Sequence, residues 1–403
     1  MKFQQLVAAC GLVLAVSRVA VAQQPVSRAE AIAAVISRGP RVALARADSA
    51  AARARVTIAR QFENPVGSAS YSKSVPQLHY VLDIPIDFPW LRSPRISGAM
   101  AGMGAARYRY VFEREAAAFE ADTTYTRALA AAKRMALSAR SARDGDSLLV
   151  LARVRRDAGD GSELDVQLAT VIAGQLANAA ARDSLASVGA LLDLQSLMGI
   201  DTKSPALALA DTLDIGNAIS DSSNGVQLLV AAAESDAQAA EYAVRLQKRT
   251  LFAPPSLSLG FESHDPTGTE NGALPTIGIA LPLPLFNQNR GAIGLAQAER
   301  DRAQAALALA HIEGSAQLLR ARRELSAARD RAARSGRLQQ SAERVAALSL
   351  LAFREGAAAL PSVLEAQRAS RDALSQYVED VAAARNAAGI VRLLTLTVDR
   401  IQP

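Results

Sequence analysis

Two stretches of this chain, residues 95–156 and 292–354, contain no proline and are rich in Ala, Arg and Leu. Residues of high helix propensity dominate both, so each stretch predicts one continuous helix. At about 1.5 Å per residue, such a helix is a rod on the order of 90 Å long. A compact domain cannot hold a rod of that length, so these stretches exclude an ordinary globular fold.

The rods belong to a larger internal repeat. The segment LDIPIDFPWLRSPRISGAMA at 82–101 resembles IALPLPLFNQNRGAIGLAQA at 279–298, with Pro85 aligned to Pro282 at an offset of 197. Gly159 and Gly356 keep this offset about 75 residues further on. Compositional bias towards alanine does not reproduce matched prolines and glycines. The sequence therefore predicts two tandem copies, residues 23–215 and 216–403.

Each copy follows the same plan of helix, strand pair, rod and return helix. The strand pairs are expected at 65–73 with 78–90, and at 256–264 with 274–286. Apolar and polar residues alternate clearly in three of these strands and only weakly in 65–73. The first helices are expected at 28–61 and 225–250, and the return helices at 163–198 and 362–394. Rod and return helix together form an antiparallel helical hairpin of coiled-coil character.

The N-terminus predicts export. Residues 1–22 have a basic start, an apolar segment from Leu6 to Val16 and a small-residue cleavage pattern, which indicates a signal peptide. Cys10, the only cysteine, lies inside it, and too few residues precede it for a good lipidation signal. Only 4% of residues are aromatic and the basic residues are spread along the helices, so nucleic acid is not an expected partner.

Four strands with an apolar and a polar face cannot form a stable open sheet, because their edges would aggregate. Strands of about ten residues that alternate in this way suit a membrane-spanning barrel. Four strands are too few to close a barrel, so several chains are expected to share one. For an exported protein this pattern indicates an outer membrane.

The chain resembles the TolC-like outer-membrane efflux channels. The resemblance rests on LPLPLFNQNRGAIGLAQAE after the second strand pair, on the tandem repeat and on the turn GDGSELDV at 159–166, and it covers the whole mature chain. It implies a mixed α+β membrane protein, mostly helical. In a homotrimer of this kind, three chains share a 12-stranded barrel, and their coiled-coil helices continue as a periplasmic tunnel.

Two groups of site residues follow. The strand-to-helix junctions are expected where proline ends each strand and asparagine caps the next helix, at Pro85, Pro89, Pro282, Pro284, Asn287, Asn289 and Gly291. The resemblance places the periplasmic tip and adaptor contact at Gly159, Asp165 and Gly356, and the constriction or gate at Glu365, Ser362 and Asp165. An N-terminal helix cap is the alternative role for Asp165 and Glu365. Phe353 and Ala358 stand where relatives often carry polar or basic gate residues.

The resemblance implies a passive export conduit that docks on a periplasmic adaptor and a proton-driven inner-membrane pump. The wording of the first motif is similar to the branch that serves heavy-metal cation pumps. Type I protein secretion is the alternative within the family, and a periplasmic adaptor or a structural coiled coil is the alternative outside it. Nothing in the sequence indicates an enzyme, a cofactor or a bound metal, since His79, His264 and His311 lack partners at ligand spacing.

Overall fold

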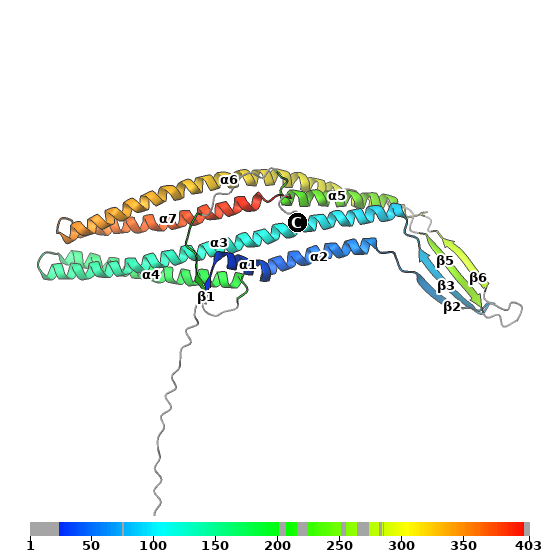
Figure 1. Ribbon diagram of the computed structural model, residues 1–403, viewed down its shortest axis with the longest axis horizontal. Helices are drawn as coiled ribbons and strands as arrows, with labels where there is room; N and C mark the ends of the chain where they lie inside the picture. The colour runs from blue at the N-terminus through cyan, green and yellow to red at the C-terminus, as the bar shows by residue number, and fades with distance from the viewer. Residues whose placement is uncertain are drawn as a thin grey trace, which may run out of the picture.

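The chain forms a long, narrow body with a β-sheet at one end and two helical turns at the other (Figure 1). The computed structural model describes residues 24–74, 76–200, 207–215, 225–250, 255–263, 274–281, 284 and 286–398. The predicted signal peptide, Cys10, Pro282 and His264 lie outside this part. No helix in the described part is long and apolar enough to span a membrane.

Seven helices and six strands make up the described chain. The helices are α1 (Arg28–Arg38), α2 (Pro40–Arg60), α3 (Pro89–Asp157), α4 (Glu163–Leu197), α5 (Leu228–Arg249), α6 (Arg290–Arg354) and α7 (Leu360–Leu394). The strands are β1 (Gln24–Val26), β2 (Val66–Tyr71), β3 (Leu78–Pro85), β4 (Leu207–Leu209), β5 (Ser256–Ser263) and β6 (Leu274–Ala280). The two rods are α3, with 69 residues, and α6, with 65, so each is about 100 Å long.

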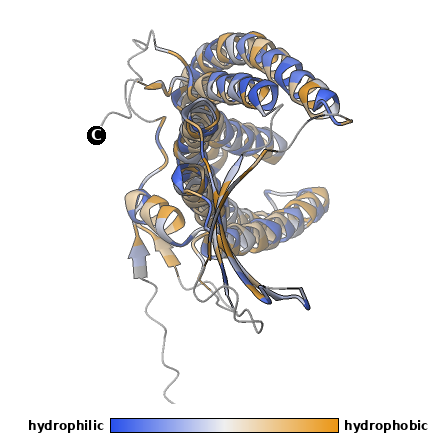
Figure 2. Cartoon of the chain, turned by 90° about the vertical axis from the view of Figure 1, so that its right-hand side faces the viewer, coloured by the Kyte–Doolittle hydropathy of each residue, from blue (hydrophilic) through white to orange (hydrophobic). Residues whose placement is uncertain are grey.

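The main sheet has the strand order β2-β3-β5-β6, and each neighbouring pair is antiparallel. Each strand is continuous with one helix of the adjoining layer, so the helices α2, α3, α5 and α6 follow the same order. Seen along the long axis, the helices form a curved layer that is open on one side (Figure 2). The molecule thus looks like a segment cut from the wall of a tube.

Alanine lets the helices of this wall pack closely. The core cluster between α6 and α7 consists largely of small side chains, with Ala328, Ala332 and Ala384 almost fully buried. This explains the low aromatic content, because closely packed long helices leave little room for large rings. A mostly helical protein with small sheets, as expected from the sequence, is therefore confirmed.

Several expected element boundaries were wrong. The strands expected at 78–90 and 274–286 end at Pro85 and Ala280, before the prolines and asparagines that follow. The helix expected at 28–61 is broken into α1 and α2 at Gly39 and Pro40. Proline lacks a backbone N–H and starts a new helix well, so the chain turns there.

Midway along the rod, a charged cluster joins the two copies of the repeat. Arg28 and Arg385, from α1 and α7, both pair with the carboxylate of Asp122 on α3. The Asp211 carboxylate accepts a 2.7 Å hydrogen bond from the backbone N–H of Arg28. That hydrogen bond is the main reason why the pKa of Asp211 lies below its ordinary value. The cluster fixes the first copy against the last helix.

Candidate functional site at the two ends of the rod

The helical turns at the tip have the same geometry in both copies. Gly159 has φ 85° and Gly356 has φ 77°, the left-handed region that side chains disfavour. In the first turn, Gly159 and Asp160 donate to the carbonyls of Arg156 and Arg155. Gly356 and Ala357 make the matching pair of bonds in the second turn. Both are Schellman caps, so the glycines end the rods as their spacing suggested.

The two return helices start differently. In the first, Ser162 and Asp165 form a capping box, with the Ser162 hydroxyl accepting from the Asp165 N–H at 3.1 Å. The Asp165 carboxylate accepts from the Ser162 N–H and hydroxyl in return. In the second, Ala359 offers no side-chain cap, and the hydroxyl of the exposed Ser362 donates back to the Ala359 carbonyl. The capping role is therefore the one that the geometry supports for Asp165.

A hydrophobic cluster joins the two helical hairpins at the tip. Phe353 of α6 is only 4% exposed and packs among residues of all four hairpin helices, which include Leu148, Val166 and Val363. From α3, the Arg155 guanidinium lies 4.8 Å from the Phe353 ring centre and donates to the Phe353 carbonyl oxygen at 3.2 Å. Where relatives were expected to carry a polar gate residue, this chain has a buried ring that ties its hairpins together.

Glu365 stands apart from this cluster. Its side chain is exposed on α7, just after the turn, and forms no hydrogen bond or ion pair with any described residue. Two ion pairs stabilise the first turn instead. The Arg156 guanidinium contacts the carboxylates of Asp157 at 2.7 Å and Glu163 at 3.0 Å. Hydrogen bonds from Gln167 and Arg156 lower the pKa of Glu163. The structure thus brings Asp165 into a cap and leaves the Glu365 carboxylate free to face solvent.

At the first junction, proline both ends the strand and starts the helix. Pro85 is the last residue of β3, and Pro89 is the first residue of α3. Pro94 lies inside α3 and cannot donate to the carbonyl of Trp90, four residues before it. The Arg249 guanidinium of α5 donates to that carbonyl at 2.9 Å. Because Arg249 replaces the missing bond, α3 begins before Arg95, where the sequence had placed its start.

At the second junction, the asparagines act differently from the expected caps. Asn289 precedes α6 with φ 55° and makes no side-chain cap. Its amide instead donates to the backbone and side-chain oxygens of Gln247 on α5, at 2.8 and 3.2 Å. Asn287 accepts the Asn289 N–H at 3.0 Å. Pro284 and Gly291 flank this tie, and a side chain at Gly291 would meet open space.

The main sheet has two chemically different faces. Residues Tyr80, Leu82 and Ile84 of β3 lie opposite Phe261, Leu259 and Leu257 of β5, and the apolar row continues to Ile277 and Ile279 of β6. The opposite face carries Asp83, which accepts a hydrogen bond from Ser258, and the pair His79–Glu262 at 3.3 Å. Ile277 and Ile279 are more than 70% exposed, so the apolar face has no cover in a single chain.

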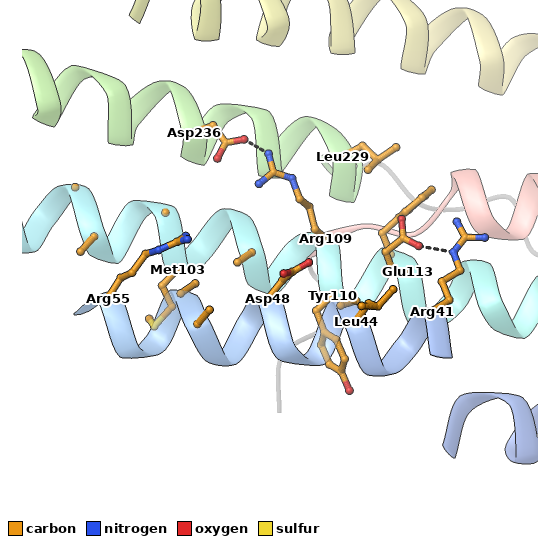
Figure 3. Close-up of a pocket in the computed structure, with 18 residues that line it drawn as sticks. Arg41, Leu44, Asp48, Arg55, Met103, Arg109, Tyr110, Glu113, Leu229 and Asp236 are labelled. Carbon is orange, nitrogen blue, oxygen red and sulfur yellow. Dashed lines mark hydrogen bonds and ion pairs between the residues drawn. The ribbon is translucent and has the colours of Figure 1, made fainter. Parts of the chain in front are cut away.

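The sequence did not reveal a cleft of about 930 Å³ between α2 and α5 (Figure 3). Small residues of α3, including Gly98, Gly102 and Ala106, form its floor. Two ion pairs cross its rim, Arg41–Glu113 at 2.6 Å and Arg109–Asp236. Four-residue spacing of small residues on α3 was the available signal.

No group of three or more possible metal ligands occurs among the residues that the structure describes. No protein-family profile matches the sequence, and no curated protein matches it either.

Several solved structures are similar to this chain. One, a membrane protein from Pseudomonas aeruginosa, has a TM-score of 0.78 and 20% identity over 92% of this chain and 90% of its own. The outer membrane protein VceC from Vibrio cholerae has a TM-score of 0.75 and 16% identity over 92% and 96%. The CmeC outer membrane channel of Campylobacter jejuni has a TM-score of 0.74 and 17% identity, over 91% of this chain and 85% of its own. At these identities the likeness concerns the fold, and the chain shares the fold of these three membrane proteins.

Proposed function

We propose that this chain is the outer-membrane channel of a tripartite efflux system, a passive conduit that extends from the outer membrane of a Gram-negative-type cell into the periplasm. The observation that carries the proposal is the four-stranded sheet, which has one apolar and one polar face and continues into a curved wall of helices. A spanning barrel turns its apolar side chains to lipid and its polar ones to the lumen.

A homotrimer completes the channel. The sheet ends in β2 on one side and β6 on the other, and the helical layer ends in α2 and α6 on the same two sides. The two edges differ, so contacts between copies are head-to-tail and close by rotation. Three copies supply twelve strands, a number within the range of known barrels.

Exposed apolar side chains on the two edges support this closure. Leu44 and Ile58 of α2 are 14 positions apart, as are Leu295 and Leu309 of α6, and all four are more than half exposed. The two helices run in opposite directions relative to the sheet (Figure 1), so Ile58 near the end of α2 and Leu295 near the start of α6 both lie close to it. In the trimer we expect Ile58 of one copy to face Leu295 of the next. Nearer the tip, exposed apolar residues recur every seven positions on α4 and α6, the spacing of a coiled-coil seam: Leu164, Val171, Leu338 and Val345.

This placement supports the partners that we propose. The tip, with the Schellman turns at Gly159 and Gly356, faces away from the sheet and is the surface for a periplasmic adaptor, which links the channel to an inner-membrane pump. The cargo we propose is heavy-metal cations or small toxic molecules. The free carboxylate of Glu365, repeated three times around an axis, suits a cationic cargo.

Purified full-length protein in a planar bilayer tests the channel. Step-like conductance from a detergent-resistant trimer is expected, and a monomer without conductance would overturn the proposal. The cargo is tested by deleting the gene and measuring sensitivity to metal salts and organic toxicants. A strain that keeps its resistance to both but loses secretion of a protein would favour the secretion alternative.

A further inference from the structure

We propose that the junction between sheet and helices binds the phosphate groups of anionic phospholipids in the membrane leaflet next to the helices. This inference rests on the proposed function and adds a lipid class to it. The residues that carry it form a junction belt of three exposed cations and three aromatic rings: Arg60, Lys248 and Arg290 with Phe62, Trp90 and Phe286.

The belt spans the full width of the wall. All four helices that are continuous with the sheet meet it at the same level, where α2 and α5 end and α3 and α6 begin (Figure 1). Arg60 ends α2, Lys248 lies in the last turn of α5, and Arg290 begins α6. The apolar face of the sheet stops just before this level, at Ile84 and its neighbours. The belt therefore lies where a bilayer changes from hydrocarbon to headgroups.

Two of the three aromatic rings of the belt are held in place although they are exposed, and the third, Phe286, is fully exposed. Trp90 is 51% exposed, and its ring stacks on Phe88 with the centroids 4.1 Å apart. Phe62 is 65% exposed, and the Arg92 guanidinium lies 4.0 Å from its ring centre. Large exposed rings are costly in water, whereas spanning barrels carry girdles of aromatic residues at both membrane interfaces. The fixed positions of Trp90 and Phe62 fit that environment.

The basic residues at the junction fall into two groups, those with structural contacts and those without an ion pair. Arg95 and Arg92 serve the fold, since they donate to the last carbonyls of α2, at Ala59 and Arg60, and Arg95 also pairs with Asp87 at 2.6 Å. By contrast, the Arg60, Lys248 and Arg290 side chains form no ion pair with any described carboxylate, and all three are exposed. Arg60 makes one long contact, from its guanidinium to the Met100 sulfur at 4.0 Å, and that contact leaves its charge unpaired. The charges of all three are therefore available to an external anion.

The helix dipole does not account for the whole set. Arg60 and Lys248 lie in the last turns of their helices, where a cation is favourable. Arg290, however, is the first residue of α6, where the dipole disfavours positive charge. The dipole therefore does not explain a cation at that position, whereas a row of lipid phosphates would stabilise it.

The test compares lipid binding by the full-length protein and a variant in neutral-detergent micelles. The variant is Arg60→Gln with Lys248→Gln and Arg290→Gln, which leaves Arg92, Arg95 and Arg249 in their structural contacts. The matched control, Arg320→Gln with Arg337→Gln and Arg344→Gln, removes the same charge from exposed positions of α6 away from the sheet. Fluorescent phosphatidylglycerol and phosphatidylcholine are the two probes.

We expect the unmodified protein and the control to prefer phosphatidylglycerol over phosphatidylcholine. Each basic residue near an anionic surface contributes about 1 kcal/mol, or about fivefold, so the triple variant should lose about tenfold or more of that preference. High salt should weaken binding, and millimolar inorganic phosphate should not compete. Equal binding of the two lipids, an equal loss in the control, or full competition by phosphate would each overturn the inference.

Conductance separates this result from the proposed function. If the unmodified protein forms no channel, the proposed function fails whatever the lipid result. If it conducts but shows no preference for phosphatidylglycerol, only the lipid inference fails. The triple variant is expected to conduct as the unmodified protein does, since none of its changes falls on the polar face of the sheet.

Discussion

The Arg155 guanidinium of α3 lies 4.8 Å from the Phe353 ring centre on α6, and it donates a 3.2 Å hydrogen bond to the carbonyl of the same residue. One side chain therefore holds both the ring and the backbone of the opposite hairpin. This relationship joins the two copies at the tip, where each rod ends.

Truncating the buried ring should loosen the tip. Phe353→Ala is expected to lower the free energy of unfolding by about 3 kcal/mol, the usual cost of removing a buried phenylalanine side chain. Phe353→Leu keeps most of the apolar volume and should cost about 1 kcal/mol. Denaturant unfolding followed by helical circular dichroism measures both. A smaller loss for Ala than for Leu would show that the cluster does not hold the hairpins together.

The tip glycines should be sensitive to any side chain. Gly159→Ala and Gly356→Ala each place a Cβ in a left-handed conformation, which costs about 1 kcal/mol. Gly291→Ala is the matched control, because it lies in the first turn of α6 with open space around it. The control should be neutral or slightly stabilising in thermal unfolding. Equal effects at all three positions would contradict the role assigned to the turns.

Substitutions of Asp165 and Glu365 should affect different properties, protein stability for Asp165 and ion selectivity for Glu365. Asp165→Ala removes a capping box and is expected to cost about 1 kcal/mol of stability. Glu365→Gln removes a charge with no described partner, so stability should stay unchanged while cation preference falls. Reversal potentials in a salt gradient measure that preference. Unchanged selectivity in Glu365→Gln would place this carboxylate away from the conduction path.

The link between Asp211 and the first turn of α1 should depend on pH. A hydrogen bond from the Arg28 N–H is the main cause that lowers the Asp211 pKa in the folded chain. The stabilisation is therefore complete above the pKa that Asp211 has in the unfolded chain, about 4. It disappears as the pH falls through the lower pKa of the folded chain. Asp211→Asn should cost about 1 kcal/mol at neutral pH. Unfolding curves at pH 7 and pH 3 should show that difference shrinking, and a constant difference would rule the link out.

The repeat and its helical hairpins could be predicted because they depend on local signals. Glycine at positions 159 and 356 ends the rods in the same way, and long runs without proline are long helices. Strand ends could not be placed, because the apolar alternation continues past Pro85 through residues that instead lead into α3. Asn289 looked like a cap but reaches across to Gln247.

Contacts between residues far apart in the chain also could not be predicted from the sequence. Phe353 looked like an unusual gate residue, but it is buried in a cluster of all four hairpin helices and contacts Arg155, 198 positions earlier in the chain. Nothing local in either segment signals that pair. In the same way, Arg249 supports α3 through a carbonyl that Pro94 leaves free, and only the folded arrangement brings these residues together.

The last prediction concerns the two edges of the helical layer, α2 and α6, which should meet in the trimer. Ile58 on α2 and Leu295 on α6 are 65% and 62% exposed in the single chain, and in the proposed trimer each is covered by the next copy. Ile58→Lys or Leu295→Lys alone should weaken the trimer, since each buries an unpaired charge in the interface. Leu229→Lys, another exposed apolar position but on α5 inside the layer, is the control. Native gels in mild detergent should show monomer for the two edge variants and trimer for the control. Joining Ile58→Glu to Leu295→Lys places opposite charges across the interface and should restore part of the trimer; failure of this pair to recover any trimer would mean that these two residues do not meet.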